Sequence, residues 1–338
     1  EWEFVQTIVP SNPSAFDYFG HSLAMDDSVL VVGTPGDNEN GHKSGSIYVF
    51  RNTINGWIEE ARLLADDGKS NDSFGESVAV LGAQILVGAY RGSGITSKTG
   101  CAYSFSYDGN EWAQDGKLFA DDGYDYDHFG CSVALSGDWA LVGAYKGNDK
   151  QGAAYLYYND GLTLFRSNLG VGVSDRFTRE FKDQKGNSLS SVRNVKFEKN
   201  KSKQNYSNEI IHEKEQESIP VKDSDQKSVI EEKRLGKPYD SEIAENQSST
   251  TRENRSWSQF QKLVPSDEVF GAFYGYSVDI KENTAVIGSY LANGNETQSG
   301  AVYIYEFQNE SWVESNKLFE PMGIKHDHYG IQVRIDLN

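Results

Sequence analysis

The sequence predicts an all-β fold, namely a β-propeller built from four-stranded blades, and three observations lead to this prediction. An aromatic-Gly pair recurs along the 338 residues, and three of the four spacings between pairs are 55 residues. The same short apolar segments follow each pair, and 33 Gly, 19 Tyr and 17 Phe against two Met favour short strands and tight turns over helices. Such a fixed period is typical of repeat architectures. The pairs are Phe19-Gly20, Phe74-Gly75, Phe129-Gly130, Tyr274-Gly275 and Tyr329-Gly330.

The first two strands of each unit follow the aromatic-Gly pair directly. The first alternates in the manner of a half-buried strand and reads HSLAM at 21–25, ESVAV at 76–80, CSVAL at 131–135 and YSVDI at 276–280. After a short turn, the second reads VLVVGTP at 29–35, ILVGAY at 85–90, ALVGAY at 140–145 and AVIGSY at 285–290. The pattern predicts one hairpin per unit.

The third and fourth strands complete each unit after a polar loop. The third begins with Gly and reads GSIYVF at 45–50, GCAYSF at 100–105, GAAYLYY at 152–158 and GAVYIYEF at 300–307. The fourth begins with Trp and reads WIEEARLL at 57–64, WAQDGKLF at 112–119, WSQFQKLV at 257–264 and WVESNKLF at 312–319. A sheet this small cannot bury both faces alone, so we expect the units to stack as propeller blades. The strand glycines mark close backbone approaches between them.

These recurring signatures resemble a known repeat family. FGESVAV followed by ILVGAY, and FGCSVAL followed by ALVGAY, look like FG-GAP repeats, the blades of the integrin α-chain N-terminal propeller. The resemblance covers about residues 1–160 and 256–338. Because family propellers usually have seven blades, it implies a fragment or one half of an assembly, completed by further repeats or a partner chain.

One spacing is longer, which divides the chain into three parts. From Gly130 to Gly275 the interval is 145 residues, one period plus 90, and the excess falls between a third strand and its fourth. We therefore predict propeller blades at 1–160, a charged low-complexity insertion at 161–255, and the remaining blades at 256–338. The insertion has 18 basic and 16 acidic residues and the composition of disorder. A tolerated loop extension and a partner-binding arm both remain open for it.

The two ends of the chain extend the repeat pattern. Residues 2–9, WEFVQTIV, match a fourth strand, and residues 329–335, YGIQVRI, match a first strand. We therefore expect partial terminal strands in addition to the four blades.

Acidic side chains collect on one predicted face of the blades. Loops that enter the first strand share this face with loops that join the second strand to the third, and in integrin-like propellers the corresponding face binds ligand. The predicted ligand face has carboxylates at Asp37, Glu39, Asp66, Asp67 and Asp72, and the third entry loop adds Asp121, Asp122, Asp125 and Asp127.

Calcium is the cofactor that these carboxylates suggest, since hard cations prefer several oxygen ligands. The integrin-type calcium cage is a DxDxDG loop between the first and second strands. Here those connections are only MDDS, LGA, SGD and KEN, so the integrin-type sites are absent. The candidate metal ligands are instead Asp121, Asp122, Asp125 and Asp127, although aspartates in such loops also cap turns.

Tyr90, Tyr145 and Tyr290 recur just after the second-strand glycine, where the first unit has Pro35. They are assigned to the ligand face as stacking groups for a sugar or a partner side chain. The alternative is that they pack blades together with a polar hydroxyl at one end.

Several function classes are disfavoured. The net charge of −18 argues against nucleic-acid binding, and no segment has the length and apolarity of a membrane helix. No nucleophile elbow, HExxH, P-loop or dinucleotide fingerprint occurs, so we expect no enzyme and no catalytic residues. Cys101 and Cys131 are read as two separate thiols on strands.

The sequence therefore predicts a non-enzymatic extracellular or cell-surface module for adhesion, recognising a protein or glycan through its acidic loop face. Seven Asn-x-Ser/Thr sequons agree with a secreted glycoprotein. Two alternatives stay open: an accessory propeller of a larger secreted enzyme, which the family's resemblance to the propeller of glycosylphosphatidylinositol-cleaving phospholipases allows, and a purely structural scaffold.

Overall fold

The computed structural model of the chain describes residues 3–159, 176–182, 188–194, 257–267 and 270–336. The predicted all-β class is confirmed, since the described residues form strands and one four-residue helical turn, α1 (Gly147–Lys150). The chain divides into two compact units, one of residues 1–166 with 252–338 and one of residues 167–251. Over the described ranges, no helix is long and apolar enough to span a membrane.

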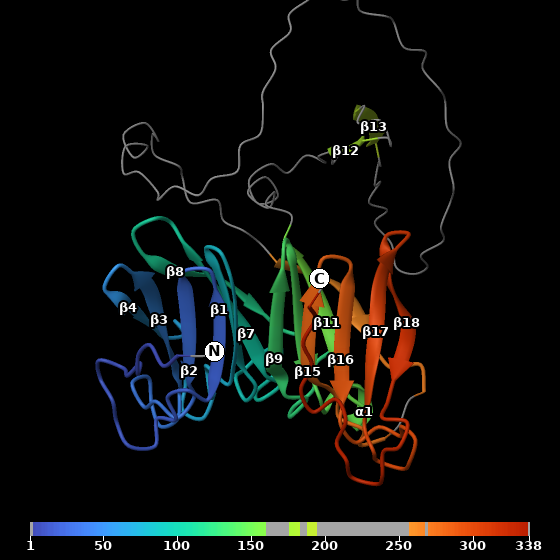
Figure 1. Ribbon diagram of the computed structural model, residues 1–338, viewed down its shortest axis with the longest axis horizontal. Helices are drawn as coiled ribbons and strands as arrows, with labels where there is room; N and C mark the ends of the chain where they lie inside the picture. Colours follow the sequence, from blue (N-terminus) through green and yellow to red (C-terminus); the bar gives the residue numbers. More distant parts are fainter. Residues whose placement is uncertain (1–2, 160–175, 183–187, 195–256, 268–269, 337–338) are drawn as a thin grey trace, which may run out of the picture. The chain divides into compact units, whose positions relative to one another are not determined.

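Within the first unit the described strands form four antiparallel four-stranded sheets, called blades 1 to 4 below (Figure 1). Blade 1 contains β1 (Ser22–Asp26), β2 (Val29–Thr34), β3 (Ser46–Thr53) and β4 (Gly56–Leu63). Blade 2 contains β5 (Ser77–Leu81), β6 (Gln84–Ala89), β7 (Cys101–Tyr107) and β8 (Trp112–Leu118). Blade 3 contains β9 (Phe129–Ser136), β10 (Trp139–Ala144), β11 (Ala153–Asn159) and β14 (Trp257–Leu263). Blade 4 contains β15 (Tyr274–Lys281), β16 (Thr284–Ser289), β17 (Ala301–Gln308) and β18 (Ser311–Leu318).

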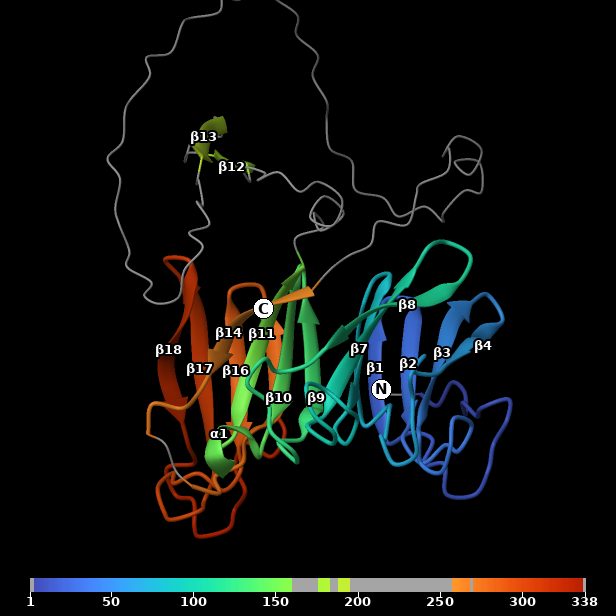
Figure 2. The ribbon, with the colours of Figure 1, turned by 180° about the vertical axis from the view of Figure 1, so that it is seen from behind.

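Successive blades lie side by side (Figure 2). Apolar side chains on their facing sides form shared buried clusters. Val31 and Val49 of blade 1 share one buried cluster with Val78 and Ile85 of blade 2. The aromatic residue of the FG-type pair lies in each later interface, and Phe74, Phe129 and Tyr274 are fully buried. Aromatic residues of the repeat therefore supply large apolar contacts between neighbouring blades.

The second-strand glycine is required by a close backbone approach between blades. A Cβ atom placed on Gly88 would lie 1.9 Å from the carbonyl oxygen of Gly130 in the next blade, closer than any real contact. Beside this contact, Ser77 Oγ donates a hydrogen bond of 3.0 Å to the same carbonyl. The same contact recurs at every junction. The distance between neighbouring blades is therefore set by a second-strand glycine that lies against a backbone carbonyl of the next blade or of the C-terminal segment.

The terminal segments occupy repeat positions without forming strands. Residues 3–9 and 329–335 have no strand assignment apart from a bridge between Gly300 and Tyr329, which corrects the expectation of partial terminal strands. Nevertheless, Gln6 exchanges two hydrogen bonds of 3.0 Å with the backbone of Trp57, as Gln261 does with Trp312. Each segment packs against its neighbour as predicted, but no described third or second strand lies beside it to complete a ladder.

The predicted insertion separates β11 from β14, yet these strands pair directly from Ala154–Leu263 to Asn159–Trp257. Within the second unit, β12 (Arg176–Lys182) and β13 (Ser188–Asn194) form an antiparallel pair. The prediction of disorder for 161–255 otherwise lies outside the described residues. Cys101 and Cys131 are free thiols on β7 and β9, as predicted.

Candidate ligand-binding face

The entry loop of each later blade and the loop between the second and third strands of the preceding blade lie at the same end of the sheets, the lower end in Figure 1. Backbone hydrogen bonds connect them: Asn71 N–H donates to His42 O, and Tyr126 N–H donates to Lys98 O. A parallel bridge between a glycine and the next blade's aromatic residue, such as Gly45 with Phe74, closes each junction. The two sets of loops therefore form one continuous face, called the loop face below.

Two of the predicted ligand residues, Asp72 and Asp127, are buried turn caps. Their side chains are 7% and 8% exposed, and their Oδ2 atoms accept hydrogen bonds of 2.8 Å from the backbone N–H groups of Lys69 and Tyr124. Burial raises the pKa of both carboxyls. The same cap recurs at Asp17 and Asp327, which identifies a structural role shared by the repeats.

Asp67 and Asp122 belong to a second repeated arrangement. Asp67 accepts hydrogen bonds from Tyr103 Oη at 2.8 Å and from Lys117 Nζ at 2.6 Å, and the lysine also lies over the tyrosine ring. Equivalent Asp-Tyr-Lys triads are formed by Asp122 with Tyr155 and Lys262, and by Asp267 with Tyr303 and Lys317. The triads explain the Lys-Leu signature of the fourth strand, because the lysine anchors the entry loop of its own blade.

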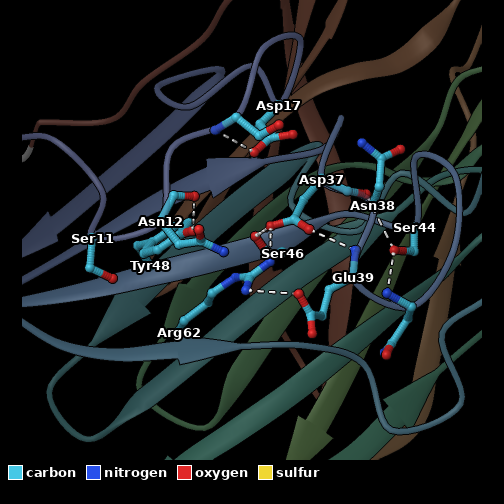
Figure 3. A network of polar contacts seen from close by, with 12 residues as sticks. Ser11, Asn12, Asp17, Asp37, Asn38, Glu39, Ser44, Ser46, Tyr48 and Arg62 are labelled. Atoms are coloured by element: carbon cyan, nitrogen blue, oxygen red, sulfur yellow. Dashed lines mark hydrogen bonds and ion pairs between the residues drawn. The ribbon is translucent and has the colours of Figure 1, made fainter.

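Blade 1 forms a different network around Asp37 (Figure 3). Asp37 is 2% exposed as a whole residue, and its carboxylate accepts hydrogen bonds from Ser46 Oγ at 2.6 Å and from Arg62 at 2.5 Å. Glu39 is exposed and forms a longer 3.2 Å contact with the same guanidinium group. Burial favours a higher pKa for Asp37, but the hydrogen bonds from Ser46 and Arg62 outweigh it and lower the pKa. Asp37 is therefore an internal anchor of the β2–β3 loop.

The remaining predicted residues, Asp66, Asp121 and Asp125, are exposed, and each has a different hydrogen-bond partner. The backbone N–H groups of Asp66 and Asp121 donate to the side chains of Gln114 and Gln259, while Asp125 Oδ1 accepts a 2.6 Å hydrogen bond from Thr96. Among the described residues, no group of three or more His, Cys, Asp or Glu is placed to hold a metal ion. The calcium site on the third entry loop therefore stays a prediction from sequence alone.

The three predicted tyrosines form part of a ladder of aromatic rings. Tyr90 contacts His128 at 5.1 Å between ring centroids, and His128 contacts Tyr145 at 4.9 Å. The ladder continues through Phe273 to Tyr290. Each tyrosine contacts a residue of the next entry loop, so the rings connect neighbouring blades and favour the packing interpretation over a free stacking surface.

His128 is the most shielded ring of this ladder. It is 8% exposed, and its Nδ1 lies 2.6 Å from Tyr145 Oη. Burial and the nearby Lys146 and Arg91 lower the pKa of His128 to about 4, so the ring is neutral at physiological pH. Its recurrence as His328, where it contacts Tyr290, agrees with a structural function.

A cavity of about 630 Å³ opens on the loop face between the entry loops of blades 3 and 4 and α1. Predicted residues Asp125 and Asp127 line one wall. The other lining side chains were not singled out from sequence: Tyr124, Tyr126, Lys146, Asp149, Lys150, Phe270 and Phe273. Tyr124 is 75% exposed and Phe270 is 73% exposed, so these rings are presented to solvent at the cavity.

The loop beside this cavity differs from its counterparts. Residues 146–152 form a loop three residues shorter than those at 36–45, 91–100 and 291–300. The positive φ of Lys150 is shared by the loops, since it recurs at Lys43, Lys98 and Gln298. The tip also contains Asn148 and Asp149 with positive φ, at 53° and 54°, a pair of non-glycine residues that the counterpart loops lack. Such backbone strain persists only where surrounding contacts impose it, and it gathers at ligand sites. The shorter loop was the one sequence signal that could have located the cavity.

The fold and the loop face define a class of protein: a β-propeller binding module whose blades are sequence repeats. A family model described as FG-GAP repeat matches residues 2–50, 57–105, 112–157 and 257–305, so the chain belongs to the FG-GAP repeat family. Repeats of this family are typically non-catalytic. A search of curated proteins found no match.

The sequence repeat is displaced from the blade by one strand. The match at 57–105 begins in β4, the outer strand of blade 1, and ends in β7 of blade 2. Each of the last three repeats therefore supplies the fourth strand of one blade and the first three strands of the next. Successive repeats are therefore joined by hydrogen-bonded ladders within a blade, such as β3 with β4, while successive blades are joined by the chain itself and by apolar packing.

Proposed function

We propose that the protein is a non-enzymatic, extracellular or cell-surface adhesion module that recognises a protein or glycan ligand through its loop face. The cavity between blades 3 and 4 carries this proposal. It combines exposed aromatic rings with a few charged groups on a rigid scaffold, which is the usual composition of a ligand site.

The electrostatic environment of the described nucleophilic groups supports a binding function rather than catalysis. The packing around Cys101 and Cys131 raises the pKa of each thiol to about 12, which keeps both protonated near neutral pH. A reactive cysteine needs the opposite shift. His128 is neutral and held by Tyr145, and thus is not placed as a free general base.

Exposure to a secretory compartment is supported by the sequons. Asn71, Asn295 and Asn309 are the sequon asparagines within the described ranges, and each is exposed to solvent. Glycosylation requires such accessibility, so these positions are compatible with a surface glycoprotein. Mass spectrometry of the protein secreted from its native cells should find N-glycans at one or more of them, and their uniform absence would argue against this location.

Cell binding tests the proposed function. The whole chain, displayed as a fluorescent multimer, should label the surfaces of suitable cells, and the double variant Tyr126→Ser with Phe270→Ser should lose most labelling. Ile54→Ser is the matched control, because Ile54 is 100% exposed in the β3–β4 turn, at the end of blade 1 away from the loop face. Equal labelling by the double variant and the wild type would contradict the proposal.

A further inference from the structure

The blade 4 entry loop departs from the repeat at the cavity. Blades 2 and 3 place the buried caps Asp72 and Asp127 where blade 4 has Ala272, and residue Phe270 precedes it by two positions. Phe270 is 73% exposed and its ring is approached only by Lys150, at 6.0 Å from the centroid to Nζ, among the ring contacts found over the described residues. Packing of the fold therefore gives no reason for an aromatic residue here.

Two more exposed aromatic rings line the same cavity. Tyr124 is 75% exposed and Tyr126 is 54% exposed, and both belong to the blade 3 entry loop. Together with Phe270 they line the cavity with ring surfaces from two different entry loops, and Lys98 Nζ lies 5.5 Å from the centroid of the Tyr126 ring. A ring face carries partial negative charge, which favours the weakly positive C–H groups of an apolar or sugar-like surface.

The charges lining the cavity nearly cancel, which sets it apart from the blades. Asp125, Asp127 and Asp149 oppose Lys146 and Lys150, whereas the blades outside residues 161–255 contain 34 acidic and 14 basic residues. A strongly anionic ligand would be repelled by the surrounding acidic blades. A strongly cationic one would be attracted by the three aspartates and repelled by the two lysines, of which Lys150 already lies over Phe270, so the lining does not select a charged ligand of either sign.

We propose that this cavity binds a neutral saccharide, an inference that rests on the proposed function and specifies its ligand. Hydroxyl groups both donate and accept hydrogen bonds, so they match a lining that mixes carboxylates, ammonium groups and tyrosine hydroxyls. The aromatic rings would contact the C–H faces of the sugar. A volume of about 630 Å³ lies within the range of small-ligand sites and suits a ligand of a few sugar rings. A folded protein partner is instead bound over an extended surface, about 800 Å² on each partner.

A printed array of neutral, sialylated and sulfated oligosaccharides tests the inference with the full chain as the probe. Neutral glycans should bind, and calorimetry with the best one should show affinity about tenfold weaker for Phe270→Ala, corresponding to the loss of one stacking contact. Phe270→Tyr keeps the ring and should keep the affinity, and Ile54→Ser should bind as the wild type. Thermal melting confirms that every variant is folded.

The outcomes separate this inference from the proposed function. Preference for sialylated or sulfated glycans, or no glycan binding at all, would overturn the neutral saccharide. If the cell-binding loss of the Tyr126 and Phe270 double variant persisted in that case, the adhesion function would stand with a protein as its ligand. If neutral glycans bound equally to Phe270→Ala and the wild type, the cavity would be excluded as their site.

Discussion

Blade 1 and blades 2 to 4 use the same position of the fourth strand to anchor different loops, namely the β2–β3 loop in blade 1 and the entry loop in blades 2 to 4. Blades 2 to 4 use a triad in which a half-exposed aspartate, such as Asp67, meets Lys117 at 2.6 Å. In blade 1 the fourth strand carries Arg62 in place of lysine, and its partner Asp37 has a side chain only 3% exposed. The cation of the fourth strand therefore forms a solvent-exposed ion pair in blades 2, 3 and 4, but a buried ion pair in blade 1.

Burial decides what each pair contributes to stability. Removing one partner of a buried pair leaves an unpaired charge away from water, whereas an exposed pair is screened by solvent and contributes little. The blade 1 network is also less completely satisfied, since Arg62 Nε and Asp17 Oδ1 lack a partner within the described part of the chain. We therefore expect blade 1 to respond most strongly to substitution.

The largest effect is expected for Arg62→Met. Loss of the guanidinium leaves the Asp37 carboxylate buried without its charge partner, and the free energy of unfolding should fall by about 3–5 kcal/mol. Urea denaturation at neutral pH measures this change. A fall of less than about 1 kcal/mol would erase the distinction between the two kinds of pair.

The stability that the Asp37–Arg62 pair contributes should depend on pH. The pKa of Asp37 is lowered in the folded protein, so its ionised form contributes stability above the pKa of about 3.9 in the unfolded chain. That contribution is lost as pH falls through the lower folded-state pKa. The difference in unfolding free energy between the wild type and Arg62→Met should therefore shrink below pH ~4, and a constant difference from pH 7 to pH 3 would contradict the assignment.

An intermediate effect is expected for Tyr103→Phe in blade 2. The change removes the hydroxyl that donates to Asp67, a half-exposed acceptor that water and Lys117 can still satisfy. The unfolding free energy should decrease by about 1 kcal/mol. Tyr303→Phe in blade 4 is the matched variant, because it breaks the equivalent bond to Asp267, and the two changes should agree.

Lys117→Met should have a smaller effect, about 0–1 kcal/mol, because Asp67 is 54% exposed at its side chain and the ion pair is screened. Raising the salt concentration should reduce the difference between this variant and the wild type further. A loss comparable to that of Arg62→Met would show that exposure is not what separates blade 1 from blade 2.

The smallest change is expected for Asp127→Asn. Burial raises the pKa of Asp127, so its ionised form lowers stability as pH rises through the folded-state pKa. Asparagine keeps an oxygen acceptor for the Tyr124 N–H without the charge, and the unfolding free energy at pH 7 should rise by about 1 kcal/mol or less. The gain should vanish in acid, where Asp127 is protonated, and thermal melts at pH 3 and pH 7 compare the two conditions.

The sequence predicted the blades well because their signals are local. Alternation, turn residues and the recurring Phe-Gly and Val-Gly pairs specify each hairpin, and the close approach at Gly88 explains the glycine directly. The terminal segments were assigned to the correct repeat positions, but the prediction that they form strands was wrong. A strand requires a hydrogen-bonding neighbour, and pattern alone does not reveal one.

The loop face was harder to predict because an aspartate in the sequence does not reveal which structural function its carboxylate has. Asp72, Asp37 and Asp67 serve as a turn cap, a buried anchor and a triad member, distinctions that depend on contacts between blades. The aromatic residues of the cavity come from two repeats separated by the insertion. Only their folding around the short loop at α1 brings Tyr126 and Phe270 to one site.

The direct pairing of β11 with β14 has a consequence for the integrity of the molecule. A protease cut between Asn159 and Trp257 would divide the chain into two polypeptides, yet the β11–β14 ladder and the packing of blade 4 on blade 3 would still join them. Such a nicked protein would behave as one particle in native solution and as two bands after denaturation. The third blade is in effect a natural split-protein junction, across which two separately produced fragments could reassemble.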